Sequence, residues 1–257
     1  MVNLHLKNIK QNKQQIIEFI KKTYIQAGKK TAVIAVSGGI DSAVSLTLLT
    51  KALGETAVFP VFLPYGDQDM SAAKRIVRWN KIPESNWREI PIDQPVDQLA
   101  RNLLIDTNDQ VRLGNVMARV RMIAIFDLAK KLTALVCGTE NKSEHYLGYF
   151  TRYGDSASDV EPILSLYKTQ VRQLAQFLKI PQVFLDKSPS AGLWINQTDE
   201  QELGFSYEEA DRVMEQLIDQ KKQLNEVVGV DQQIAKQVAD RINDTHFKHE
   251  VPYSFKL

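Results

Sequence analysis

A β-branched run that ends in a glycine-rich turn and continues into an apolar helix constrains the fold of this 257-residue chain most strongly. The run covers 31–36, the turn is Ser37-Gly38-Gly39-Ile40-Asp41-Ser42, and the helical pattern covers 41–52. The alternation then repeats, with strands predicted at 56–63, 87–92 and 133–137 and helices at 71–80, 94–105 and 110–131. Strands that alternate with helices of this length predict an α/β fold with a parallel sheet covered on both faces.

The remaining periodic segments predict helices at 10–26, 168–179 and 207–219. Two segments, 146–159 and 186–204, lack a clear period, and long irregular segments inside a domain are usually functional. We expect these segments to be loops, the second of them a mobile lid. No linker, repeat or low-complexity tract divides the chain, so 1–257 is expected to form a single domain.

Composition excludes several classes of partner. Thirty-two Lys and Arg residues balance 31 Asp and Glu residues, so no overall field draws the chain to nucleic acid or anionic lipid. No stretch approaches the ~18 apolar residues of a membrane helix, and the N-terminus lacks a signal-peptide core, which predicts a cytoplasmic protein without membrane contact. The single cysteine, Cys137, is expected to be a buried, unpaired thiol.

The turn at 37–42 has the chemistry of a phosphate-binding loop. Two glycines allow backbone N–H groups to approach an anion, and the helix N-terminus adds a partial positive charge. Ser37 and Ser42 can donate to phosphate oxygens, and Asp41 can hold a divalent metal. The alternative is an ordinary tight turn in which Ser42 or Asp41 caps the helix. The Walker pattern is absent, so a kinase-type site is not expected.

The motif Ser-Gly-Gly-x-Asp-Ser resembles the signature of the N-type ATP pyrophosphatases, which implies cleavage of ATP between its α and β phosphates. Six further blocks occur in the order found in the NAD synthetase family within that group. They are Leu63-Pro64-Tyr65-Gly66-Asp67-Gln68, Gly114-Asn115-Val116-Met117-Ala118-Arg119-Val120-Arg121-Met122, Gly138-Thr139-Glu140-Asn141-Lys142-Ser143-Glu144, Gly148-Tyr149-Phe150-Thr151-Arg152-Tyr153-Gly154-Asp155, Pro189-Ser190-Ala191-Gly192-Leu193-Trp194 and Gln197-Thr198-Asp199-Glu200. The resemblance therefore covers nearly the whole chain.

This resemblance implies a Rossmann-like, adenine nucleotide alpha hydrolase-like fold and the amidation of deamido-NAD with ammonia, ATP being the co-substrate and Mg²⁺ the cofactor. Asp41 and Glu144 are then the metal ligands, and Asp41, Lys168 and Asp159 are the catalytic residues, Asp159 lying near the ammonia. The implied ATP-binding residues are Ala35, Val36, Ser37, Gly38, Gly39, Ile40, Asp41, Ser42, Gln68, Thr139, Lys168 and Ser190. Those implied for deamido-NAD are Arg119, Arg152, Asp159, Phe247 and Lys248.

Three positions depart from the family pattern. Arg152 stands where the family often has lysine, Phe247 replaces a histidine beside Lys248, and Phe62 replaces a common arginine. The first keeps the charge but not the geometry. The second places any role for an imidazole in doubt, and the third weakens an implied ATP contact.

Purely structural roles for single residues remain alternatives to these functional roles. Arg119 alone also suits a surface ion pair, and Glu144 suits a solvated first-turn acid stabilised by the helix dipole. For the whole chain, the alternatives are another N-type ATP pyrophosphatase, such as a tRNA-modifying or GMP-synthetase-like enzyme, and a nucleotide-sensing module without turnover. Relatives that use glutamine carry an extra amidase domain with a nucleophilic cysteine, which neither the length nor the cysteine content matches, so free ammonia is expected.

The helix that carries Arg119 also predicts a homodimer. From 116 to 132 it is apolar around most of its circumference, whereas a surface helix needs one apolar face. The surplus face predicts a two-fold interface with a second copy, as the family resemblance also implies. The alternative is a helix buried entirely within one chain.

Overall fold

Four parallel strands form the centre of the fold in the computed structural model, which describes residues 4–106, 108–194, 197–249 and 252–255. The strands are β1 (Ala32–Ala35), β2 (Val58–Phe62), β3 (Arg88–Glu89) and β4 (Leu135–Cys137). Their order is β3-β2-β1-β4, and every neighbouring pair is parallel. The order reverses at β1, because β2 adds on one side and β4 on the other. Ligands of open parallel sheets bind beyond the carboxyl ends of the strands at such a reversal.

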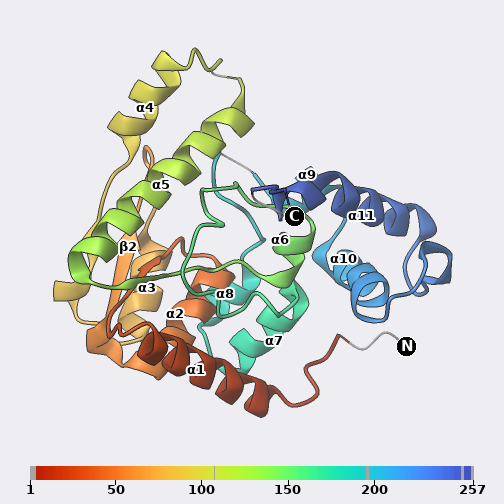
Figure 1. The fold of residues 1–257 in the computed structure, drawn as a ribbon, viewed down its shortest axis with the longest axis horizontal. Helices are drawn as coiled ribbons and strands as arrows, with labels where there is room; N and C mark the ends of the chain where they lie inside the picture. The colour runs from red at the N-terminus through yellow and green to blue at the C-terminus, as the bar shows by residue number, and fades with distance from the viewer. Residues whose placement is uncertain (1–3, 107, 195–196, 250–251, 256–257) are drawn as a thin grey trace.

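Helices surround this sheet and extend from it (Figure 1). The described α-helices are α1 (Ile9–Gln26), α2 (Ile40–Leu53), α3 (Ser71–Trp79), α4 (Asp93–Asn102), α5 (Gln110–Leu132), α6 (Lys142–Tyr146), α7 (Lys168–Phe177), α8 (Gln182–Asp186), α9 (Asp199–Leu203), α10 (Tyr207–Met214) and α11 (Gln232–Thr245). A π-helical turn, Glu215–Asp219, continues α10. None of the described helices is long and apolar enough to cross a bilayer.

Alternating side chains of the strands enter two separate cores, as the two-residue period of a strand requires. Ala32 and Ile34 pack with the buried faces of α1, α2 and α7. Val33 points to the opposite face and packs with α4 and α5. The expected parallel sheet with helices on both faces is therefore confirmed. Cys137 is buried and unpaired, as expected.

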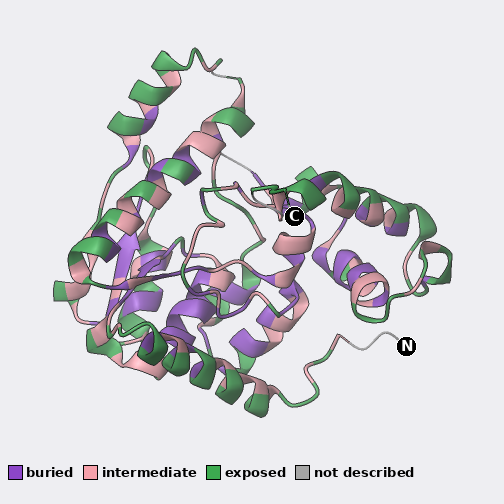
Figure 2. Ribbon diagram, viewed as in Figure 1, coloured by how far each residue is buried: buried purple, intermediate pink, exposed green. Residues whose placement is uncertain are grey.

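A third core joins the C-terminal helices to the sheet layer. α10 and α11 pack around Leu147, Met214 and Val238, and α10 also contacts α6 and α7. These helices lie beside the sheet rather than over it (Figure 1). In Figure 2 the ribbons of α10 and α11 carry both buried and exposed residues, as expected of helices with one side against the rest of the fold. No helix was predicted from the sequence at 232–245, where α11 lies.

Other differences from the expected elements have local causes. The third strand is shorter than 87–92, although Ile90 N and Ile92 N still donate to Phe62 O and Pro64 O, each at 2.9 Å. Pro64 has no N–H to return a bond, so the regular ladder ends there. The segment 186–204 is not wholly irregular either, because α9 lies within it. Residues 195–196 of that segment lie outside the described residues.

Candidate active site

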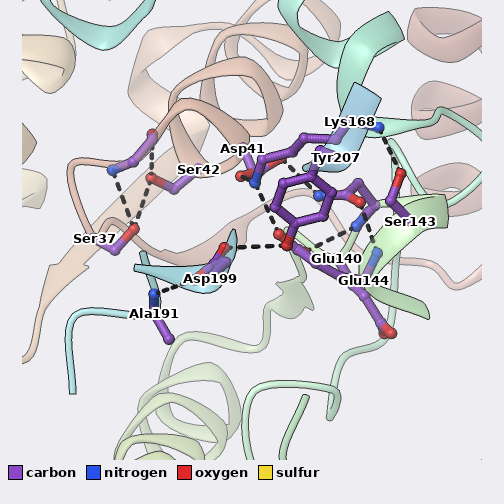
Figure 3. A network of polar contacts seen from close by, with 12 residues as sticks. Ser37, Asp41, Ser42, Glu140, Ser143, Glu144, Lys168, Ala191, Asp199 and Tyr207 are labelled. Atoms are coloured by element: carbon purple, nitrogen blue, oxygen red, sulfur yellow. Dashed lines mark hydrogen bonds and ion pairs between the residues drawn. The ribbon is translucent and has the colours of Figure 1, made fainter. Parts of the chain in front are cut away.

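The glycine turn after β1 brings hydroxyl groups and amides together at the carboxyl end of the sheet. Gly38 has φ +77°, and a Cβ there would lie 3.1 Å from both Ala72 Cβ and Ala73 N. A side chain at this position is therefore strained and crowded. Ser42 Oγ donates to Gly39 O at 3.0 Å and lies 3.2 Å from Ser37 Oγ (Figure 3). The turn thus presents two hydroxyls at the N-terminus of α2.

Three charged side chains meet beside this turn. Lys168 Nζ donates to Asp41 Oδ2 at 2.6 Å and to Glu144 Oε1 at 2.9 Å (Figure 3). The lysine side chain is only 3% exposed, whereas the two acids are 16% and 17% exposed. The amide of Asn141 donates to the other oxygen of Asp41 at 2.9 Å. The group formed by Asp41, Glu144 and Lys168 is hereafter called the triad.

Helix starts position each member of the triad. Asp41 lies in the first turn of α2, directly beyond β1. Asn141 and Glu144 form a capping box at the start of α6, which fixes Glu144 at the carboxyl end of β4. Lys168 begins α7, and its backbone N–H donates to Ser143 Oγ at 2.8 Å. Ser143 in turn donates to the buried Asp211.

Burial and charge act against each other within the triad. Burial alone lowers the pKa of Lys168, but the carboxylates of Asp41 and Glu144 raise it above its usual value. Burial raises the pKa of Glu144, and the nearby ammonium of Lys168 opposes that rise. A buried cation between two carboxylates is stable only when the pairing is close and complete. Asp41 and Glu144 therefore hold the ammonium of Lys168 between the carboxyl ends of β1 and β4.

The start of α9 forms another side of this site. Asp199 is buried, and its carboxylate accepts from Ala191 N at 3.0 Å and from the hydroxyl of Tyr207 at 3.1 Å. The ring of Tyr207 lies 5.0 Å from Lys168 Nζ. Burial raises the pKa of Asp199, and the charge of Lys168 opposes this. Neither Asp199 nor Tyr207 had a role predicted from the sequence.

Comparison with known proteins identifies the family of this site. The sequence model of the family described as NAD synthase matches residues 12–252. This chain belongs to the NAD synthase family. Two similar curated relatives are the NH(3)-dependent NAD(+) synthetases of Fusobacterium nucleatum and Pyrococcus furiosus. They are 40% and 38% identical, over 97% and 95% of this chain and 97% and 93% of theirs.

Solved structures of the family share the fold. The structure described as NMN synthetase from Francisella tularensis has a TM-score of 0.84 at 30% identity, over 97% of this chain and 99% of that one. The NH3-dependent NAD synthetase from Campylobacter jejuni has a TM-score of 0.81 at 28% identity, over 96% of this chain and 99% of that one. These similarities extend beyond the sheet to the C-terminal helices.

A second group of basic side chains, implied by the NAD synthase pattern for the dinucleotide, gathers around 148–153. Arg119 Nε donates to Arg152 O at 3.3 Å. The guanidinium of Arg152 lies 5.7 Å from the ring of Phe247. Lys248 Nζ donates to Gly148 O at 2.6 Å and to Phe150 O at 2.9 Å. Helix α5, the loop 146–159 and the C-terminal segment thus each bring one cation to this region.

An imidazole lies near this group, although Phe247 replaces the histidine of the NAD synthase pattern. The rings of His249 and His145 have centroids 4.2 Å apart. Nδ1 of His145 lies 3.1 Å from Glu140 Oε1. Burial lowers the pKa of His249 to about 4, so this imidazole is neutral at physiological pH. Among the described residues, no group of three or more His, Cys, Asp or Glu has the geometry of a metal site.

The remaining predicted residues are more widely spread. The side chain of Gln68 links α5 to the loop at Gly192. It accepts from Arg121 Nη2 at 3.0 Å and donates to Gly192 O at 2.5 Å. Ser190 Oγ accepts from Gly192 N at 3.0 Å. Asp159 Oδ2 accepts from the backbone N–H of Val136 at 2.8 Å, so this carboxylate is bound to strand β4 and not to the triad.

The other predicted ATP contacts lie close to the turn or to β4. Ala35, Val36 and Ile40 flank the glycine turn, and half-buried Thr139 follows β4. Phe62, which replaces a common arginine of the NAD synthase pattern, is buried in the core. Its ring packs edge-to-face on Trp87, with centroids 5.7 Å apart. This side chain therefore serves the core rather than the site.

Glu161 is a residue near the site that sequence reasoning missed. Its carboxylate accepts from Glu140 N at 3.1 Å and from Ser158 Oγ at 2.8 Å. Burial raises the pKa of Glu161 to about 8, and the charges of Glu140 and Glu144 act in the same direction. Its closeness to the turn after β4 depends on tertiary structure, so no local sequence signal identifies it.

Proposed function

We propose that this chain amidates deamido-NAD with ammonia at the expense of ATP, giving NAD, AMP and pyrophosphate through an NAD-adenylate intermediate. The observation that carries the proposal is the triad beside the glycine turn, in a chain 40% identical to a curated NH(3)-dependent NAD(+) synthetase. Another N-type ATP pyrophosphatase and a sensing module are less well supported, because the relatives named above are synthetases.

The first half-reaction requires ATP phosphates to be held in line with a carboxylate. The amides at Gly38 and Gly39 and the hydroxyls of Ser37 and Ser42 are available to the phosphates. Lys168 supplies a positive charge that neutralises the charge developing on the phosphates when pyrophosphate leaves. Thr139, Gln68 and Ser190 complete the proposed ATP contacts.

The carboxylates of Asp41 and Glu144 fit Mg²⁺. Both are hard oxygen ligands, and both already converge on one cation, the ammonium of Lys168. When bound, the metal would neutralise phosphate charge and help align the phosphates. All other contributions come from the protein's own side chains.

In the second half-reaction ammonia displaces AMP from the mixed anhydride. Adenylation supplies the leaving group that a free carboxylate lacks, so no protein nucleophile is required. Arg119, Arg152 and Lys248 are proposed to bind the dinucleotide phosphates, with Phe247 lining the same site. Asp159 is proposed to contact the dinucleotide and to lie near the ammonia.

The homodimer belongs to the same proposal. On α5, Ile123 is 60% exposed, which favours an apolar face left for a partner over a helix buried wholly within one chain. A second copy is proposed to cover this face through a two-fold interface near Arg119. The cytoplasmic location and the single-domain organisation stay predictions from the sequence.

The test is mass detection of NAD after incubation with ATP, magnesium, ammonium and deamido-NAD. Glutamine in place of ammonium is the control for the nitrogen donor, and we expect little product with it. Nicotinate mononucleotide in place of deamido-NAD is the control for the acceptor, because one similar structure is described as an NMN synthetase. Product from the mononucleotide alone would overturn the proposed substrate.

A further inference from the structure

A buried carboxylate outside the triad connects the triad to a surface loop. Asp199 is 3% exposed and begins α9. Its carboxylate accepts from the backbone N–H of Ala191 and from the hydroxyl of Tyr207, both drawn in Figure 3, and the hydroxyl of Tyr149 is a further partner. Burying a carboxylate is costly unless its oxygens are hydrogen-bonded, so these contacts stabilise the buried carboxylate of Asp199.

Tyr207 touches Asp199 and the triad at the same time. Its hydroxyl donates to Asp199 Oδ2 at 3.1 Å, while its ring lies 5.0 Å from Lys168 Nζ. Tyr207 is itself 3% exposed and is the first residue of α10, so the ring has little freedom to move. Any shift of Asp199 is therefore transmitted to the surroundings of Lys168.

The loop at 189–194 has other attachments as well, among them the bond from the backbone N–H of Asp199 to Pro189 O at 3.1 Å. Gly192 O accepts from Gln68 Nε2, and Leu193 N donates to Gln197 Oε1 at 2.7 Å. Leu193 also packs against Gly114 on α5, where a Cβ would lie 2.8 Å from Leu193 Cδ1. Ser190, Ala191 and Gly192 are all exposed. Asp199 thus holds the chain on both sides of Ser190, and the bond from Ala191 N is the one that depends on its side chain.

We infer that Asp199 and Tyr207 are positioning residues that hold the Ser190 loop against the Lys168 site and thereby set the affinity for ATP. This inference rests on the proposed function for the identity of the ligand. Neither residue is required to touch ATP. Asp199 acts through the amide of Ala191, and Tyr207 acts through Asp199 and through the surroundings of Lys168.

The variant Tyr207→Phe tests this role, because it keeps the ring over Lys168 and removes only the hydroxyl. We expect KM for ATP to rise about tenfold, the size of one lost hydrogen bond to a charged group, with kcat within about threefold of wild type. Hydrogen exchange should show weaker protection of 188–194 in the ligand-free protein.

Tyr167→Phe is the matched control. Tyr167 is 2% exposed, and its hydroxyl donates to a different acid, Asp219, at 3.0 Å. It therefore loses the same type of bond from an equally buried ring. We expect its KM for ATP and its exchange at 188–194 to match wild type.

Asp199→Asn and Asp199→Leu separate positioning from packing. Asparagine keeps an acceptor for Ala191 N, so we expect a KM between those of wild type and the leucine variant. Equal effects of Tyr207→Phe and Tyr167→Phe, or unchanged exchange at 188–194 in Tyr207→Phe, would overturn the inference. The exchange measurement requires no turnover, so its outcome is independent of whether wild type forms NAD.

Discussion

Gly138 and Glu161 approach so closely that a Cβ on Gly138 would lie 1.8 Å from Oε1 of Glu161. The carboxylate of Glu161 occupies the space that a side chain at position 138 would fill. We expect Gly138→Ala to lower the free energy of unfolding by about 1–3 kcal/mol, the usual cost of overpacking. The double variant Gly138→Ala, Glu161→Ala should recover much of that loss in denaturant unfolding. Additive losses would show that the clash is not the cause.

Glu161 also predicts how stability depends on pH. Burial raises its pKa to about 8 in the folded chain, above the ordinary glutamate value of 4.5. The folded state therefore binds more protons than the unfolded state between these values, and this contribution to stability falls as pH rises from 4.5 to 8. Glu161→Gln should be more stable than wild type at pH 8.5, with the gain shrinking toward pH 5. Melting curves at both values test this, and a gain that grows at low pH would contradict it.

The two acids of the triad should serve turnover more than folding. We expect Asp41→Asn and Glu144→Gln each to reduce kcat by about 100-fold or more, since removing one electrostatic group commonly costs that much. Melting temperature should change little, because Lys168 keeps one carboxylate partner in either variant. Asp240→Asn, which removes an exposed pair with Lys236 on α11, is the control for charge alone. A large melting-temperature loss with full activity would refute the assignment.

Lys168 should compete with a divalent cation for the carboxylates of the triad. Both oxygens of Asp41 have partners, and Glu144 Oε2 accepts from Asn141 N at 3.4 Å while Oε1 accepts from Lys168. We expect Lys168→Met to lose turnover. In the absence of ATP, Mg²⁺ should raise the melting temperature of this variant more than that of wild type. Equal shifts in the two proteins would mean that the ammonium does not exclude the metal.

The exposed face of α5 predicts the oligomeric state. Ile123→Asp should convert a dimer to a monomer and reduce dinucleotide binding, because Arg119 lies on the same helix. Ile25→Asp on α1 is a matched control, since Ile25 is 78% exposed but lies on a different face. Light scattering at micromolar concentration measures the mass. A wild-type mass of one chain with full activity would rule out the dimer.

The sheet and the placement of the glycine turn beside Asp41 and Glu144 were predictable because their signals are local. Strand, glycine turn and helix follow one another at 31–52, and parallel strands bring Asp41 and Glu144 to one edge. α11 was also detectable, since Ile234, Val238 and Ile242 recur at helical spacing after Asp231, although no helix was expected there.

The contacts of Asp199, Tyr207 and Glu161 were not predictable from local pattern. α9 has only five residues, too short for a helical period to stand out in the sequence. Asp199 reads as a surface acid until the fold buries it. Asn141-x-x-Glu144 did carry a usable signal, because an Asn followed three residues later by Glu is typical of a helix start.

The 127 residues that separate Asp41 from Lys168 have a consequence for synthesis of the chain. Contacts between residues so distant in sequence form late in folding, because closing a long loop costs conformational entropy. A nascent chain that has exposed β1 and α2 carries Asp41 but has not yet presented Glu144 or Lys168. Tyr207 and Asp211 must also emerge before Lys168 and Ser143 are fully surrounded. The site around Lys168 is therefore incomplete until residues well beyond the first half of the chain have been synthesised.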